Sequence, residues 1–353
     1  MVLFYLLQHL DPAKYAIYVF CFKKGELYEA LPAGIQKCLM LQASTNRSDK
    51  FRLRILKKLK KDSLAYQLNK IQKSFKADIW FVNTISVPDL FWIAKKNGVR
   101  VVTFVHELLY AFTFIDMKTM KNLVADSDVF IGCSQEVCER IADMGHNNVK
   151  LQHSFVDLNL IKPDWNKVSM LKKEMGFLPT DFVWVISGKT TYMKGLDYII
   201  PILEFFKDQP VKILWIGNEE NTGLEFYVKE MARLKYPDKL FFAGAQSSEY
   251  YNYMAIGNGL LLLSREESFS LVLVEAANMG MPIVSFDIGI AKNLIKEGFG
   301  YVIENRDLQQ LLDAMQAVKN EPAPDKELLT NASREYSVET QLPKFEKIID
   351  ELF

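Results

Sequence analysis

Two carboxylates, Glu267 and Glu275, are separated by seven residues in the stretch 264–287, which reads SREESFSLVLVEAANMGMPIVSFD. This stretch is typical of a polar loop after a strand, a helix over about 270–279 and a new strand that begins near residue 282. Glu275 is the one carboxylate in the apolar helix, and a buried carboxylate is costly unless its oxygens accept hydrogen bonds. We therefore expect Glu275 to have defined hydrogen-bond partners, and the alternative is a capping or surface role.

The loop before this helix offers a seat for a phosphate group. It places Glu267 and the backbone N–H groups of Phe269, Ser270 and Leu271 at the helix N-terminus. Unpaired N–H groups and the helix dipole favour an anion at that position. The alternative is that Glu267 interacts only with the dipole.

A second candidate site is the basic loop from Gly188 to Gly195, which reads GKTTYMKG and follows the apolar run 182–187. Lys189 and Lys194 can reach one phosphate group from this loop, and a helix that begins near Gly195 would present its N-terminus to it. Fixed cations stabilise the negative charge that grows on a departing phosphate. The alternative is that both lysines are solvated surface residues.

Further candidates follow other apolar runs. His106 comes directly after the run 100–105, and ligands gather at the carboxyl ends of parallel strands. A structural hydrogen bond is the alternative for this histidine. Gly217 follows a third run, and Gly244 and Gln246 follow a fourth, at corresponding positions.

The elements that must position these residues alternate along almost the whole chain. Short runs rich in Val, Ile and Phe alternate with helical patterns, which predicts an α/β fold with parallel sheets covered by crossover helices. The predicted strands span residues 16–22, 78–83, 100–105 and 128–133 in the front half, and residues 182–187, 211–216, 239–243, 259–263 and 282–286 in the back half.

The 353 residues exceed the length at which one core keeps growing, so we expect two Rossmann-like domains. We place the domains at 1–160 and 161–336, with the junction in the polar stretch 155–168. The final segment, 337–353, has helical periodicity, and we expect it to pack back on the front domain.

The two carboxylates with their spacing, the following Gly-x-Pro strand start and the loop 188–195 together resemble the motif of glycosyltransferase family 4. The resemblance covers about residues 180–305 and is specific in the order and spacing of its parts, with Lys189 at a position where Arg is usual. It implies the GT-B fold, in which two Rossmann-like domains face a cleft. The domain 1–160 would then be the acceptor side, and 161–336 would bind the nucleotide sugar.

The resemblance also implies roles for single residues. Glu275 would hold the ribose hydroxyls, Glu267 and the neighbouring amides would contact the transferred sugar and the phosphates, and His106 would face the donor sugar. The implied catalytic residues are His106, Lys189, Lys194 and Glu267. The implied donor-binding residues are Gly188, Gly217, Gly244, Gln246, Phe269, Ser270, Leu271 and Glu275.

A retaining glycosyltransferase is the activity that the resemblance implies. It would move a sugar from a UDP- or GDP-linked donor to a glycan or lipid-linked acceptor, in cell-surface polysaccharide synthesis. We expect no cofactor and no metal, because no Asp-x-Asp dyad lies in a strand-end loop and lysines balance the diphosphate instead.

Three other interpretations have to be considered. A dehydrogenase would need a Gly-x-Gly-x-x-Gly turn, which the sequence does not contain. A sugar-nucleotide epimerase of the same fold and a donor-binding but inactive subunit or truncated remnant both remain alternatives. The last arises because the family begins with a strand and a glycine-rich loop, whereas residue 1 here already belongs to a predicted helix, so that first strand is expected to be missing.

Charge is distributed unevenly along the chain. The first 160 residues carry 22 basic and 15 acidic side chains, although the whole chain has 43 of each. Between residues 51 and 75 the basic residues alternate with leucines on one helical pattern, which predicts a peripheral contact with an anionic membrane surface and not with nucleic acid. The four cysteines show no metal or redox spacing, so we expect a cytoplasmic protein, peripheral on the inner face of the membrane.

Overall fold

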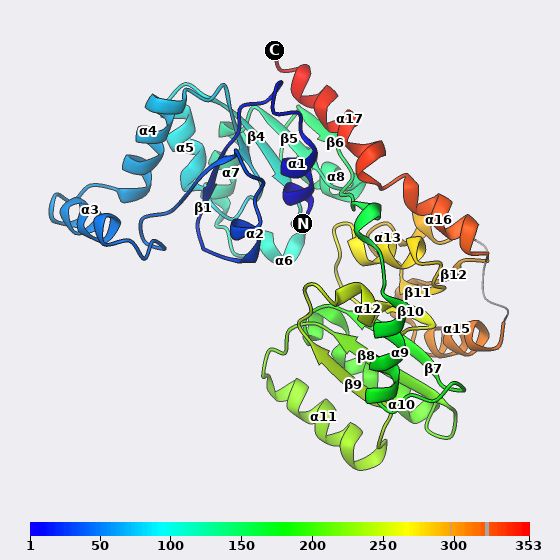
Figure 1. The fold of residues 1–353 in the computed structure, drawn as a ribbon. Helices are drawn as coiled ribbons and strands as arrows, with labels where there is room; N and C mark the ends of the chain where they lie inside the picture. Colours follow the sequence, from blue (N-terminus) through cyan, green and yellow to red (C-terminus); the bar gives the residue numbers. More distant parts are fainter. Residues whose placement is uncertain (297, 322–324) are drawn as a thin grey trace. The chain divides into compact units, whose positions relative to one another are not determined.

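The computed structural model of the protein describes residues 1–296, 298–321 and 325–353. The chain folds into two compact units, which are described separately. Unit 1 comprises Met1–His153 with Leu342–Phe353, and unit 2 comprises Ser154–Gln341 (Figure 1). The predicted junction at 155–168 lies on the unit 2 side of this division.

Unit 2 is built on a six-stranded parallel sheet with the order β12-β11-β10-β7-β8-β9. The strands are β7 (Phe182–Ser187), β8 (Val211–Ile216), β9 (Leu240–Gly244), β10 (Gly259–Leu262), β11 (Ile283–Phe286) and β12 (Gly300–Ile303). The chain order reverses between β7 and β10, which is the arrangement of a doubly wound Rossmann fold.

Helices connect these strands and cover the sheet. They are α9 (Trp165–Glu174), α10 (Ile199–Phe205), α11 (Gly223–Lys235), α12 (Tyr250–Met254), α13 (Leu271–Asn278), α14 (Ala291–Leu294), α15 (Leu308–Asn320) and α16 (Lys326–Arg334). Several begin at a side-chain cap that accepts from first-turn N–H groups, as Thr222 does for α11 and Asp307 for α15. The core contains Trp184, Trp215 and Phe286, which are fully buried.

Unit 1 contains a four-stranded parallel sheet with the order β3-β4-β5-β6 and a separate parallel pair, β1-β2. The strands are β1 (Tyr18–Cys21), β2 (Gln36–Leu39), β3 (Ile79–Val82), β4 (Arg100–Val105), β5 (Val129–Gly132) and β6 (Val149–Leu151). Five consecutive residues of β4 are buried, because a central strand covered on both faces needs a continuous apolar run.

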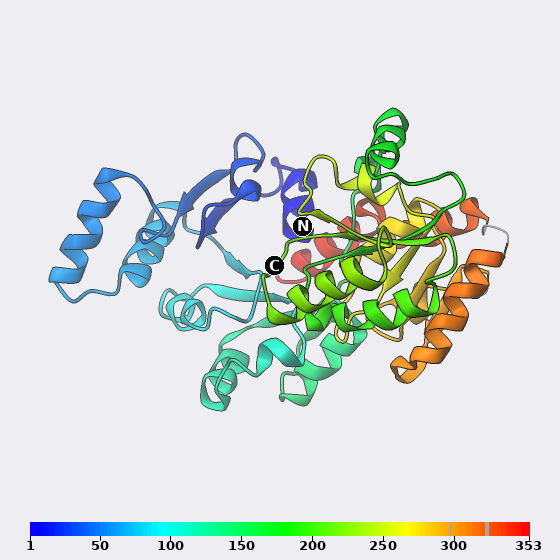
Figure 2. The same ribbon diagram turned by 90° about the horizontal axis from the view of Figure 1, so that it is seen from below.

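The helices of unit 1 are mostly short. They are α1 (Val2–His9), α2 (Glu26–Glu29), α3 (Arg47–Lys58), α4 (Ser63–Phe75), α5 (Asp89–Lys96), α6 (Leu109–Phe112), α7 (Met117–Asp126) and α8 (Gln135–Asp143). In both views α3 lies at the outer edge of unit 1 (Figures 1 and 2).

Helix α17 (Val338–Asp350) begins in unit 2 and ends in unit 1. Within unit 1, the ring of Phe345 packs edge-on against Phe81, with the ring centroids 5.6 Å apart, and Asp350 accepts a 2.8 Å bond from Lys14. The C-terminal residues of the chain therefore contribute to the core of unit 1, which also contains the N-terminal residues.

The structure confirms the α/β class with two Rossmann-like units and corrects two local expectations. The segment 51–75 is not one helix, because α3 ends at Lys58 and α4 starts again with Asp62 as its cap. After the basic loop, the α-helix begins at Ile199 and not near Gly195, since two 3₁₀ turns, Tyr192–Lys194 and Leu196–Tyr198, come first.

Candidate functional site

The two motifs of the back half follow the two strands at which the order of the unit 2 sheet reverses. The loop 188–195 leaves the carboxyl end of β7, and the loop 263–270 leaves that of its neighbour β10. In open parallel sheets this reversal opens a crevice in which ligands bind. Residues that are separated by more than 70 positions in the sequence are therefore neighbours at one edge.

Glycine lets the two loops approach each other. Gly195 has a φ of 80°, and a Cβ atom at this position would lie only 2.4 Å from the carbonyl oxygen of Leu263. A larger residue would thus push the basic loop away from the end of β10. Gly188 is fixed on the opposite side, where its carbonyl accepts a 2.7 Å bond from the indole N–H of Trp215.

Two ion pairs connect the loops through side chains. Lys194 pairs with Glu267, and the two side chains keep 31% and 15% of their surface exposed. Arg265 donates to both carboxylate oxygens of Asp197 at 2.9 and 2.6 Å, and its guanidinium lies 3.6 Å from the ring centroid of Tyr192. The sequence interpretation did not assign a role to Arg265, although it lies inside the motif.

The N-terminus of α13 has an unusual conformation. Ser270, its cap, has a φ of 77°, a region that side chains other than glycine rarely occupy, and such strain is frequent at functional sites. The buried Ser270 hydroxyl has no hydrogen-bond partner among the described residues. The N-terminus of a helix with its dipole also favours an anion, at the position where a phosphate was predicted.

Glu275 has the defined partners that were expected of it. Its two oxygens accept hydrogen bonds from Tyr250 and Tyr251, at 3.0 and 3.2 Å, and the Tyr250 hydroxyl also lies 2.8 Å from the hydroxyl of Ser187 at the end of β7. Burial raises the pKa of Glu275. A solvated surface position is therefore the wrong interpretation of this residue.

The loop after β8 is held against the basic loop. A Cβ atom at Gly217 would lie 1.9 Å from the carbonyl oxygen of Gly188, so only glycine fits at this position. The N–H of Gly217 donates to the carbonyl of Gly244 at 2.9 Å, and Gln246 donates to that of Ala243 at 2.6 Å. Gly188, Gly217 and Gly244 thus lie along the same edge of the sheet.

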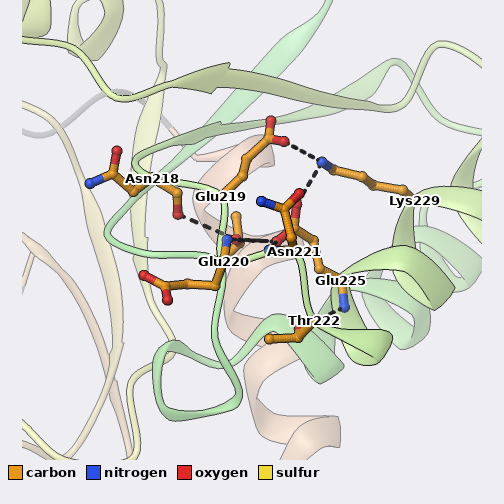
Figure 3. A network of polar contacts seen from close by, with 8 residues as sticks. Asn218, Glu219, Glu220, Asn221, Thr222, Glu225 and Lys229 are labelled. Carbon is orange, nitrogen blue, oxygen red and sulfur yellow. Dashed lines mark hydrogen bonds and ion pairs between the residues drawn. The ribbon is translucent and has the colours of Figure 1, made fainter.

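A buried carboxylate, Glu225, anchors this contact (Figure 3). One of its oxygens accepts from the Thr190 hydroxyl at 2.7 Å and from the N–H groups of Glu220 and Asn221 at 2.9 and 3.0 Å. The other pairs with Lys229 at 2.6 Å. Burial alone would raise the pKa of Glu225, but these bonds hold it below its usual value.

Lys189 extends from the same region into solvent. Its ammonium group lies 3.0 Å from Glu220, and 63% of its side chain is exposed. Such surface pairs contribute only about 0–1 kcal/mol, so Lys189 can exchange this partner for another anion.

His106 lies in unit 1, whereas all the other predicted site residues belong to unit 2. It follows β4, and its Nε2 lies 3.0 Å from Oδ1 of Asn83, which identifies Nε2 as the protonated nitrogen. Burial lowers the pKa of His106 to about 4. The imidazole is therefore neutral near pH 7 and acts through hydrogen bonds.

The described residues contain neither a candidate metal site nor a membrane-spanning helix. No group of three or more His, Cys, Asp or Glu side chains could hold a metal ion within residues 1–296, 298–321 and 325–353. Among the helices of these same residues, none has the length and apolar character to cross a membrane.

Two known protein families match consecutive parts of the chain. Residues 1–160 match the family described as glycosyltransferase family 4, and residues 170–335 match the family described as glycosyl transferases group 1. Together these matches cover both units.

Individual relatives have low sequence identity to this chain. An N-acetyl-alpha-D-glucosaminyl L-malate synthase from Bacillus anthracis is 26% identical over 65% of this chain and 62% of its own length. An alpha-galactosylglucosyldiacylglycerol synthase from Streptococcus pneumoniae is 25% identical over 81% of this chain and 80% of its own.

A solved structure of the Anabaena protein HepE, in complex with UDP and glucose, has a similar fold. It superposes with a TM-score of 0.80 at 19% identity, over 99% of this chain and 95% of that chain. Fold and family matches agree, and the chain belongs to the GT-B glycosyltransferases of the family 4 type.

Proposed function

We propose that the protein transfers a sugar from a UDP- or GDP-linked donor to a glycan or lipid-linked acceptor, with retention of the anomeric configuration. The observation that carries this proposal is the meeting of the loops 188–195 and 263–270 at the switch between β7 and β10, joined by the Lys194–Glu267 pair. The acceptor belongs to polysaccharide or glycolipid synthesis, the chemistry that the names of several relatives describe.

The donor diphosphate would lie at the N-terminus of α13. The strained cap, the unpaired hydroxyl of Ser270 and the helix dipole all favour an anion there, and Lys194 supplies a cation from the neighbouring loop. Because lysines balance the charge, the site needs no metal ion. Glycines 217 and 244, with Gln246, would hold the base mainly through backbone groups.

The reaction needs no carboxylate nucleophile. The bond between the anomeric carbon and the diphosphate oxygen breaks, the acceptor oxygen bonds to the same face of that carbon, and the acceptor proton passes to an oxygen of the departing diphosphate. Lys194 and Lys189 stabilise the charge that grows on the diphosphate. Glu267 contacts the transferred sugar, and the unprotonated Nδ1 of neutral His106 accepts a hydrogen bond from one of the sugar hydroxyls.

Isothermal titration with UDP and GDP tests the donor site. Lys194→Met should weaken binding by on the order of tenfold or more, because a charge-assisted hydrogen bond is lost. Lys207→Met is the matched control, since Lys207 also pairs with a glutamate in unit 2, at 2.8 Å, but outside the site. EDTA should leave the affinity unchanged.

The proposal is wrong if neither nucleotide binds to the wild-type protein, or if EDTA abolishes binding. Binding without any hydrolysis or transfer from a UDP- or GDP-sugar would favour the alternative of a donor-binding but inactive subunit. Conversion of the donor to an epimer would favour the epimerase.

We also propose that α3 attaches the protein peripherally to the anionic, cytoplasmic face of a membrane. Phe51, Ile55 and the C-terminal cap Leu59 recur every fourth residue along α3 and are 62%, 43% and 58% exposed. Exposed cations surround this apolar stripe, namely Arg52, Arg54, Lys57, Lys58, Lys60 and Lys61. Apolar insertion combined with cationic attraction is what anionic lipid surfaces select.

A further inference from the structure

We infer that Tyr250 and Tyr251 are positioning residues that make the donor site prefer ribose over deoxyribose, acting through Glu275. The inference rests on the proposed function and on the role that the family resemblance implies for Glu275, which is to hold the ribose hydroxyls of the donor. It adds two residues, from a different helix, that neither the motif nor its resemblance includes.

The geometry assigns one tyrosine to each carboxylate oxygen. Tyr250 lies 3.0 Å from Oε2 of Glu275, and Tyr251 lies 3.2 Å from Oε1. The two tyrosines are consecutive at the start of α12, and their rings pack edge-on with centroids 5.1 Å apart. The carboxylate is therefore held at both of its oxygens by two side chains that pack against each other.

The protons in this cluster have fixed directions. A phenol has one proton, and Tyr250 donates its proton to the carboxylate. The 2.8 Å contact between Tyr250 and Ser187 must then run from the serine hydroxyl to the phenol oxygen. This chain of donors fixes the phenol to the end of β7, the strand from which the basic loop departs.

The remaining acceptor capacity of Glu275 suits a vicinal diol. A carboxylate has about four acceptor positions on its two oxygens. One acceptor position on each oxygen of Glu275 is occupied by a tyrosine. Each oxygen therefore has one acceptor position left for a ligand. The 2′ and 3′ hydroxyls of a ribose can donate one bond to each oxygen, whereas 2′-deoxyribose leaves one oxygen with a buried, unfilled position.

The two tyrosines also keep Glu275 able to accept hydrogen bonds. Burial raises the pKa of Glu275, while the two phenol hydrogen bonds oppose that rise because they stabilise the carboxylate form. Without them the carboxyl group is easier to protonate and freer to rotate. Both changes reduce its ability to distinguish a diol from a single hydroxyl.

The test is the ratio of the affinities for UDP and 2′-deoxy-UDP, measured by isothermal titration on the full chain, with GDP and 2′-deoxy-GDP as a parallel pair. Wild-type protein should prefer the ribonucleotide by about tenfold, the value of one hydrogen bond to a charged group. Tyr250→Phe and Tyr251→Phe should each reduce this ratio by about threefold or more. Tyr253→Phe, a matched change on the same helix, should leave it unchanged.

Each other outcome has a defined meaning. Equal losses of affinity for both nucleotides in the tyrosine variants would show a merely structural role and overturn the inference. If Glu275→Gln abolishes the preference but the tyrosine variants retain it, the inference fails while the proposed function stands. If wild type has no preference and Glu275→Gln binds both nucleotides as wild type does, the proposed ribose contact itself is wrong. Thermal melting of each variant verifies that it is folded.

Discussion

His106 is a histidine whose charge the protein suppresses. Its low pKa, near 4, and its bond to the Asn83 side chain leave a neutral ring with the proton on Nε2. A neutral ring cannot attract the donor diphosphate as a cation. Its proposed contribution to sugar binding is therefore a hydrogen bond of fixed direction, which is set by the second residue, Asn83.

Because His106 stays neutral in the folded protein, the stability of the fold should decrease as the pH is lowered. In the unfolded chain His106 takes up a proton below about pH 6.5, whereas in the folded chain it does so only near pH 4. Unfolding between these values binds a proton, so the folded state loses stability as the pH falls from 6.5 towards 4. At pH 5 this contribution costs about 2 kcal/mol relative to pH 7.5.

Thermal melting of wild type and His106→Gln at both pH values measures this contribution. The variant should lose less stability on acidification than the wild type does, and all other titrating groups cancel in the comparison. A stability difference between the two proteins that stays constant from pH 7.5 to pH 5 would contradict the assignment of a buried, neutral imidazole.

Single residues of the site could be predicted only where local sequence specifies them. Glu275 was recognisable because one carboxylate interrupts an apolar helix, and Gly188 and Lys194 because they follow a clear strand. The partners of these residues were not recognisable. Tyr250 and Tyr251 lie 25 and 24 positions before Glu275, and only the folded sheet brings them to it.

At the scale of elements, the sequence predicts buried strands better than edge strands. All nine predicted strands are present, and β4, β7 and β8 have the predicted limits, because central strands covered on both faces are continuous apolar runs. Within the described residues, β2, β6 and β12 were not predicted. Each is three or four residues long, and its burial is incomplete, so its sequence carries little periodic signal.

Helix α3 is shorter than the predicted amphipathic segment for a local reason. Lys60 adopts a φ of 52°, and Asp62 accepts from the N–H groups of Leu64 and Ala65 at 2.9 and 3.2 Å, which starts a new helix. The single helical pattern expected over 51–75 therefore belongs to two separate helices with different faces. The exposed stripe that remains belongs to α3 and its cap Leu59 alone.

Vesicle flotation tests α3 as the membrane contact. Wild type should float with phosphatidylglycerol vesicles at low and moderate salt, and Phe51→Ser combined with Ile55→Ser should abolish flotation, because the apolar insertion is removed. Phe226→Ser with Leu234→Ser is the matched control, since these side chains of α11 are 69% and 65% exposed. No flotation of wild type even at low salt would contradict the proposal.

At the scale of the whole molecule, unit 2 is one uninterrupted stretch of chain, from 154 to 341, whereas unit 1 is assembled from two. Apart from His106, every residue proposed to contact the donor lies in that stretch. The fragment 154–341 should therefore fold and bind UDP with an affinity within about threefold of the full chain, a difference of less than 1 kcal/mol. Circular dichroism and isothermal titration measure both properties, and a folded fragment that does not bind would place essential donor contacts in unit 1.

The path of α17 has a consequence for how the protein is made. The ribosome releases the first 153 residues of unit 1 early, but Phe345 and Asp350, which pack against Phe81 and Lys14, follow only after the whole of unit 2. At ordinary rates of synthesis the delay is on the order of 10–40 s. The unit whose synthesis starts first is thus completed last, and until then the surface that α17 covers stays exposed in the nascent chain.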